Sequence, residues 1–210
     1  MTTANIYGYA FTNFLAAKVN WDSDTIKMAL VTSSYTPNLG TDEFWSTPQV
    51  DELANGSGYT TGGATLAGKS VTLTAADSWG TAWAATTAYT FGQVVRPSTG
   101  NGYLYQCVVA GTSAASAPSF PTTVGETVTD GTVTWCCKGE SITVVTATAP
   151  SWTFTGSVAF EYGVIYDSTP GTAATDPLIA VANFGTVSLP SGTFTANPDS
   201  SLGFLYFFPS

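Results

Sequence analysis

Short apolar segments separated by clusters of turn-forming residues are the feature that most constrains the fold of this chain. Residues 25–32 and 158–166 are such segments, and Pro, Gly, Asn and Asp gather between them. Runs of this length with frequent turns are typical of strands in antiparallel sandwiches or barrels. We expect further strands at residues 63–76, 142–149, 151–154, 178–184, 192–197 and 202–208.

One segment has a helical pattern instead. Within residues 5–18 the large apolar side chains recur at spacings of three and four, which predicts an amphipathic helix, and they are Tyr7, Phe11, Phe14 and Leu15. Residues 33–62 hold many turn signals, but they include Trp45 and Tyr59 and are expected to form an ordered loop. The expected fold is therefore mainly β, an antiparallel β-sandwich or barrel with one N-terminal helix.

Residues 79–139 differ in kind from the rest of the chain. They contain all three cysteines and three of the six tryptophans, and their charges cancel, because the charged residues are Arg96, Glu126, Asp130 and Lys138. The flanks therefore carry the whole formal net charge of −9. We expect two domains: a discontinuous β host of residues 1–78 and 140–210, and a small inserted β module of residues 79–139.

The charge and the residue content disfavour several classes of function. Fourteen acidic residues stand against five basic ones, and such a surface repels phosphate backbones and anionic lipids. We therefore expect no nucleic-acid and no membrane partner. The chain has no histidine, which removes the commonest general base and metal ligand. It shows no signal-peptide pattern and no apolar run of about 18 residues.

Three acidic pairs allow another interpretation, and they are Asp22/Asp24, Asp42/Glu43 and Asp51/Glu52. Paired carboxylates can bind calcium or serve as the acid and the nucleophile of a glycosidase. All three pairs lie in turn-rich sequence, where Asp is favoured because it hydrogen-bonds locally. The calcium-loop pattern Asp-x-Asp-x-Asp-Gly does not occur. We therefore expect no enzyme activity, no catalytic residue, no cofactor and no metal site.

Five segments of the flanks occur in an order that a known family shares. They are Asp24-Thr-Ile-Lys-Met-Ala-Leu-Val-Thr-Ser, Tyr35-Thr-Pro-Asn, Gly58-Tyr-Thr-Thr-Gly-Gly-Ala-Thr-Leu-Ala-Gly-Lys, Tyr162-Gly-Val-Ile-Tyr and Thr172-Ala-Ala-Thr-Asp-Pro-Leu-Ile-Ala. The flanks thereby resemble a family of small virion structural proteins of tailed bacteriophages. The resemblance covers most of residues 1–76 and 141–184. The large insert departs from the family pattern, and the last 25 residues match only loosely.

This resemblance implies a non-enzymatic virion structural protein. The leading expectation is a capsid decoration or cement protein on the outer surface of the virion, which binds the major capsid protein, stabilises the shell and displays the insert outward. Such a protein is expected to be made in the host cytoplasm without a signal peptide and to form a homo-oligomer, such as a trimer. Two alternatives stay open: a tail or baseplate component whose insert binds a host-surface glycan, and a free carbohydrate-binding protein.

The insert has a resemblance of its own. The segments Ala88-Tyr-Thr-Phe-Gly, Gly102-Tyr-Leu-Tyr and Asp130-Gly-Thr-Val-Thr-Trp resemble modules of phage tail and fibre proteins and, more distantly, small chitin- and cellulose-binding modules. In that resemblance Cys107 and Cys137 correspond to positions that are often both cysteine. It therefore implies a disulfide between them, with Cys136 on the other side of its strand.

Aromatic rings in the insert are candidates for glycan contact, because the apolar face of a sugar ring stacks on an exposed aromatic ring. The candidates are Trp79, Trp83, Tyr89 and Tyr103. The other interpretation is that a module of about 60 residues needs its few large side chains for its own core. Tyr105 and Trp135 alternate with apolar neighbours and fit that second interpretation best.

Overall fold

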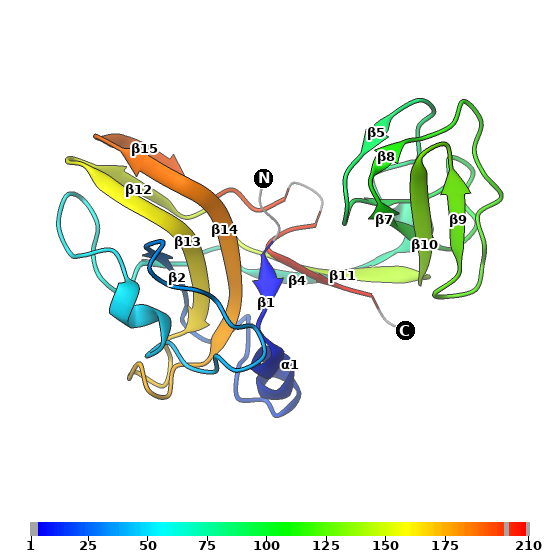
Figure 1. The fold of residues 1–210 in the computed structure, drawn as a ribbon. Helices are drawn as coiled ribbons and strands as arrows, with labels where there is room; N and C mark the ends of the chain where they lie inside the picture. The colour runs from blue at the N-terminus through cyan, green and yellow to red at the C-terminus, as the bar shows by residue number, and fades with distance from the viewer. Residues whose placement is uncertain (1–3, 200–201, 209–210) are drawn as a thin grey trace. The chain divides into compact units, whose positions relative to one another are not determined.

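The computed structural model describes residues 4–199 and 202–208 and divides the chain into two compact units (Figure 1). Unit 1 consists of Met1–Val71 and Val145–Leu205, and unit 2 of Thr72–Val144 and Tyr206–Ser210. Unit 2 thus contains the expected insert together with short stretches on either side of it and the C-terminal segment. The fold is mainly β, with antiparallel sheets and one α-helix among the described residues, as predicted.

A five-stranded antiparallel sheet is the scaffold of unit 1, in the order β1-β14-β13-β2-β3. Its strands are β1 (Asn5–Ile6), β2 (Ile26–Val31), β3 (Ala64–Thr65), β13 (Val158–Asp167) and β14 (Leu178–Leu189). In the register of β13 with β2, Val164 lies opposite Ala29 and Tyr166 opposite Lys27. Both central strands are largely buried on both faces. Burial on two faces explains why their sequences are nearly continuous apolar runs.

An aromatic cluster extends the core of unit 1 toward a second, two-stranded sheet of β12 (Ser151–Phe154) and β15 (Gly192–Thr195). Phe160 packs edge-on against Phe194, with ring centroids 4.8 Å apart. A Cβ atom at Gly163 would lie only 2.7 Å from the ring of Phe184. Glycine at this position of β13 therefore lets the Phe184 ring pack directly against the strand.

The helix is shorter than predicted, and its apolar stripe is split. Helix α1 spans Gly8–Leu15, because Asn5–Ile6 form β1 and pair with β14. Tyr7 is completely buried, whereas Phe11 and Leu15 are 47% and 90% exposed. The apolar residues of the predicted amphipathic pattern therefore do not share one buried face. The strand pairing that precedes the helix fixes which side faces the core, and periodicity alone does not reveal that pairing.

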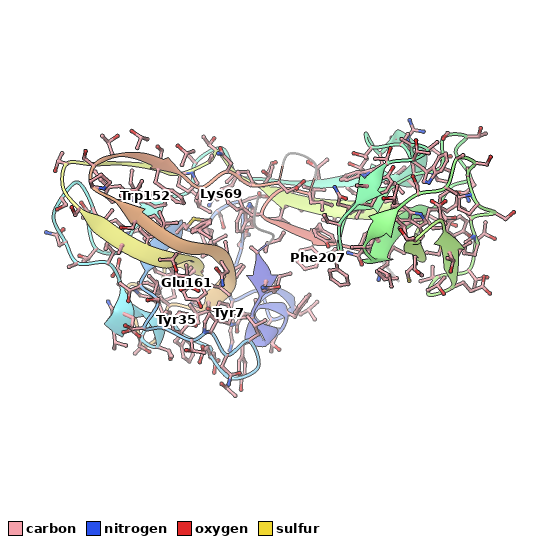
Figure 2. The ribbon with its side chains drawn as sticks, turned by 45° about the horizontal axis from the view of Figure 1, so that its top comes forward. Tyr7, Tyr35, Lys69, Trp152, Glu161 and Phe207 are labelled. Carbon is pink, nitrogen blue, oxygen red and sulfur yellow. The ribbon has the colours of Figure 1, made fainter. Side chains whose placement is uncertain are left out.

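A buried chain of hydrogen bonds ties the start of α1 to the loop 33–62. The hydroxyls of Tyr7 and Tyr35 lie 2.7 Å apart, and Tyr35 donates to Asp42 Oδ2 at 2.8 Å (Figure 2). Burial is the largest cause of the raised pKa of both phenols, which stay protonated. Trp45 and Tyr59 of the same loop are also buried. The burial agrees with the expected ordered loop, which also contains the 3₁₀ helix η1 (Pro48–Asp51).

Unit 2 has its own core, packed on one face of a four-stranded antiparallel sheet in the order β6-β7-β10-β9. The strands are β6 (Val94–Val95), β7 (Leu104–Val109), β9 (Thr127–Asp130) and β10 (Val133–Gly139). A small sheet of β5 (Ala88–Tyr89) and β8 (Gly111–Thr112) accompanies it. Alternate residues of β10 are buried. This period of two places Trp135 and Cys137 in the core and Cys136 on the opposite face.

The boundaries between the two units fall within the strands of a third sheet. Its order is β16-β11-β4, with β4 (Ser70–Ala75), β11 (Ser141–Thr146) and β16 (Leu205–Phe207). The division of the chain separates Val71 from Thr72 and Val144 from Val145. The 3₁₀ helix η2 (Ala76–Ser78) follows β4 directly.

Candidate functional site

Unit 1 contains a cleft of about 400 Å³ that is open to water. Four segments line it: β2, the loop 45–62, the end of β13 and the turn that follows it. Its polar side chains are Lys27, Gln49, Glu52, Thr61, Ser168 and Asp176. Loops held by a rigid sheet are where binding residues of β proteins commonly lie, and the volume falls in the range of small-molecule sites.

Glu52 forms the centre of one wall of the cleft. Its Oε1 atom accepts a hydrogen bond from the hydroxyl of Tyr59 at 2.7 Å and another from the amide of Gly62 at 2.5 Å. Tyr59 in turn accepts a hydrogen bond from the amide of Leu30 at 3.0 Å. Burial raises the pKa of Glu52, while these two donors and the charge of Lys27 act in the opposite direction. Both hydrogen bonds fall on Oε1, so they fix the orientation of the carboxylate, and within the described residues no hydrogen bond to Oε2 is found.

Asp176 forms a second wall and is held in a similar way. Its Oδ1 atom accepts hydrogen bonds from the amides of Gly171 at 2.9 Å and Thr172 at 3.1 Å. Burial is the largest influence on its pKa, which is raised, and the positive charge of Lys27 works against that rise. The positive charge of Lys27 thus acts on two carboxylates, of which Asp176 is buried and Glu52 is partly exposed. Partial charge compensation of this kind lowers the cost of keeping ionised groups away from bulk water.

The aromatic wall of the cleft is rigid. Trp45 and Tyr166 stack with ring centroids 4.4 Å apart and an interplanar angle of 5°, and both are buried. The hydroxyl of Tyr166 donates to the carbonyl of Gly62 at 2.8 Å. Gly62 has a φ of +88°, and a Cβ atom there would lie 3.6 Å from both Lys27 Nζ and Tyr166 Oη. Glycine is therefore favoured at this point on conformational grounds.

Together these contacts give the cleft a polar lining with both hydrogen-bond donors and acceptors. Lys27 and the amide of Gln49 offer donors, and the carboxylates of Glu52 and Asp176 offer acceptors. Within residues 4–199 and 202–208, no group of three or more Cys, Asp and Glu side chains is placed to hold a metal ion. No helix in this described part of the chain is long and apolar enough to cross a membrane. The chemistry on offer in the cleft is hydrogen bonding with a polar ligand.

The candidate glycan-contacting rings of the insert lie mostly in the core of unit 2. Trp79, Trp83 and Tyr89 are buried, and only Tyr103 is partly exposed. The ring of Tyr89 packs edge-on against Trp135 at 4.8 Å. Core packing accounts for the three buried rings, because a stacked sugar needs an exposed ring face.

Asp130 is the polar centre of that core. Its Oδ2 atom accepts hydrogen bonds from the indole N–H groups of Trp83 at 2.7 Å and Trp135 at 2.9 Å, and its Oδ1 atom accepts one from the amide of Ala114 at 2.8 Å. The residue is only 2% exposed. Sequence reasoning named Asp130 in a motif and in the charge balance of the insert, and it gave the residue no structural role. One signal in the sequence could have indicated this role: Asp130 stands beside Gly131 and five positions before Trp135, in the hairpin of β9 and β10.

The three cysteines carry free thiols, so the implied disulfide between Cys107 and Cys137 is not formed in this structure. Across the β7–β10 ladder Cys107 lies opposite Trp135, and Cys137 lies opposite Tyr105. The two cysteines share the buried face but occupy diagonal positions, which are farther apart than directly opposed ones. Burial raises the pKa of both thiols. Cys136 lies on the other face of β10 and is partly exposed, as expected.

Sequence reasoning did not find the cleft. It considered Glu52 only as half of an acidic pair, and it gave Lys27 and Tyr166 no role. The local hydrogen bonds expected of turn carboxylates are present elsewhere: Asp24 accepts a bond from the amide of Asn20 at 2.6 Å. The cleft residues become neighbours only through the register of β2 with β13 and the packing of a long loop.

No protein-family model matches this chain, and neither a curated protein nor a solved structure gives a match. The cleft of unit 1 and the aromatic core of unit 2 must therefore be interpreted from their own geometry. The exposed side of α1 must likewise be interpreted from its own geometry.

Proposed function

We propose that the protein is a non-enzymatic virion structural protein of a tailed bacteriophage, which decorates the capsid through unit 1 and carries unit 2 as an accessory module. The observation that carries the proposal is the exposed side of α1. Phe11 and Leu15 lie one helical turn apart there, on the surface of the unit that bears most of the negative charge.

Large apolar side chains that gather on a surface are typical of protein–protein contacts. The loop 33–62 contacts the start of α1, because the amide of Gly8 donates to the carbonyl of Leu39 at 2.7 Å, and the Leu39 side chain is also exposed. Burying these side chains against a capsid subunit would stabilise both partners by mass action. The contact is apolar, so it does not require a basic partner surface.

The family resemblance supports the same assignment. Residues 24–33 include β2, and residues 162–166 lie within β13, so the resembling segments form the central strands of unit 1. They therefore describe one folded scaffold rather than scattered similarity. Unit 2 has a separate hydrophobic core, as an accessory module requires.

The experiment is to quantify the chain against the major capsid protein in purified particles of the phage that encodes it. We expect a copy number comparable to that of the capsid protein. Leu15→Ser should reduce retention on the particle, whereas Val50→Ser, which changes another strongly exposed apolar residue of unit 1, should not. A few copies per particle would favour the tail or baseplate alternative. Particles without the chain would overturn the proposal.

The expected oligomer is tested separately. Sedimentation of the purified chain should show a homo-oligomer, with a trimer as the form expected from symmetric decoration sites. A monomer at all concentrations would mean that copies of the chain meet only on the shell. Leu15→Ser would then affect only binding to the particle.

A further inference from the structure

We propose that the cleft of unit 1 binds a neutral pyranose sugar, either free or at the end of a glycan, through Lys27, Glu52 and Asp176. The inference goes beyond the proposed virion role and does not depend on it. It rests on the charge of the cleft, the fixed orientation of its polar groups and its volume of about 400 Å³.

The charges select the ligand class. One lysine and two carboxylates line the cleft, so an anionic ligand meets a net negative site. The carboxylates would attract a cationic ligand, but a ligand that offers only donors leaves the donors of Lys27 and Gln49 without an acceptor. An apolar ligand would leave these groups without hydrogen-bond partners, which is costly. A sugar hydroxyl both donates and accepts, so vicinal hydroxyls can satisfy the lysine and the carboxylates at the same time.

The polar groups are already held in place. Glu52 and Asp176 each use one carboxylate oxygen for two fixed hydrogen bonds within the protein. These bonds fix the orientation of both carboxylates, which line the cleft. Preorganised acceptors lose less conformational entropy on binding, which favours recognition of a small ligand.

The aromatic wall limits the geometry of the contact. Trp45 and Tyr166 are stacked on each other and buried, so little ring face is available to a sugar. Recognition is therefore carried by hydrogen bonds, and the rings act as a stiff support. This differs from the stacking expected of the aromatic residues in the insert.

The test is an NMR titration of the full chain with sugars of one ring type and different charge. D-Glucose, D-galactose and N-acetyl-D-glucosamine are the neutral probes, and D-glucuronate and D-glucosamine are the anionic and cationic counterparts. Methyl glucoside represents the end of a glycan. We expect saturable shifts of the Glu52, Gly62 and Gly171 signals with at least one neutral sugar, and weaker binding of its charged counterparts.

Three variants connect binding to the cleft. Lys27→Met should weaken the binding of the neutral sugar by about tenfold, and Gln49→Ala should weaken it by a smaller factor. Gln49 is exposed, so its replacement tests the cleft even if Lys27→Met fails to fold. Lys18→Met, at an exposed lysine that does not line the cleft, is the matched control and should bind as the native chain does.

Two kinds of result would overturn the inference. One is the absence of saturable shifts with every neutral sugar, or shifts that Gln49→Ala and Lys27→Met leave unchanged. The other is binding restricted to glucuronate or to glucosamine, which would make the cleft an anion or a cation site. Binding of methyl glucoside but not of free glucose would support the inference and identify the glycan end as the source.

Discussion

Three carboxylates that are wholly or partly buried have different surroundings in the two units. In unit 2 both oxygens of Asp130 are occupied, by two indoles and one backbone amide inside an aromatic core. In unit 1, Glu52 and Asp176 each commit one oxygen to the protein and lie against an open cleft. A buried carboxylate whose two oxygens are both hydrogen-bonded within the core is structural. One that is held by half its acceptors beside water is available to a ligand.

The aromatic residues beside these carboxylates differ in the same way, because those around Asp130 form a closed core, whereas Trp45 and Tyr166 of unit 1 line the cleft. The rings first considered for glycan contact belong to the core around Asp130, and sequence composition drew attention to them because tryptophans and cysteines are concentrated there. The cleft of unit 1 has a less conspicuous composition. Four tests probe this comparison, from the largest expected effect to the smallest.

Removing the buried carboxylate of Asp130 in unit 2 should have the largest effect on stability. Asp130→Ala leaves two indole donors and one amide donor of a buried core without an acceptor, and we expect a loss of about 3–5 kcal/mol in the free energy of unfolding of unit 2. Urea unfolding followed by tryptophan fluorescence measures this loss. Glu126→Ala, at an exposed acid of the same unit, is the control and should change stability little. A loss below about 1 kcal/mol would show that Asp130 is not the centre of the core.

Thiol reactivity tests how closed that core is. Iodoacetamide should modify Cys136 at least about tenfold faster than Cys107 or Cys137, because burial raises the pKa of the latter two thiols and shields them. Mass spectrometry of timed samples gives the three rates, and Cys136→Ser should remove the fast phase. Denatured protein should yield three free thiols. A single free thiol, located at Cys136, would instead reveal the disulfide between Cys107 and Cys137.

The pH dependence of Glu52 tests the open site. Its pKa is raised by burial, so its contribution to stability is present at low pH and is lost as pH rises through the folded-state pKa. Glu52→Gln removes that loss. After screening by water in the cleft, the variant should gain about 0.5–1 kcal/mol over the native chain between pH 4 and pH 7. Urea unfolding at both pH values measures the gain, and a variant that loses stability relative to the native chain as pH rises would contradict the assignment.

The exposed side of α1 should matter least for folding. Leu15→Ser is expected to change the free energy of unfolding by less than about 0.5 kcal/mol, because the side chain is almost entirely exposed. Thermal unfolding beside Val50→Ser provides the comparison. A large loss would mean that Leu15 packs within the fold, and the proposed capsid contact would lose its main support.

The strands were the part of the fold that sequence predicted best. The segment expected at 151–154 is β12, and the one expected at 158–166 differs from β13 by one residue. These segments have the alternating or continuous apolar patterns that sheet burial requires. The N-terminal residues were harder, because Asn5 and Ile6 pair with β14, and a two-residue strand leaves no periodic pattern.

The sites were less predictable than the strands for a physical reason. The cleft combines Lys27, Glu52 and Asp176 from three separate segments, and only the three-dimensional packing brings them together. In the insert, composition correctly identified a region rich in aromatic residues but could not tell a buried ring from an exposed one. Exposure depends on which face of the sheet packs, and in a module of this size most large side chains are needed inside.

The central claim is that the carboxylates of Glu52 and Asp176 in unit 1 are available to a ligand, while the carboxylate of Asp130 in unit 2 is not. Carbon-13 NMR of the side-chain carboxyl groups in the full chain, recorded with and without a saturating neutral sugar, tests it most directly. We predict that the signals of Glu52 and Asp176 shift while that of Asp130 stays in place. Unmoved Glu52 and Asp176 signals, or a shift at Asp130, would contradict the account.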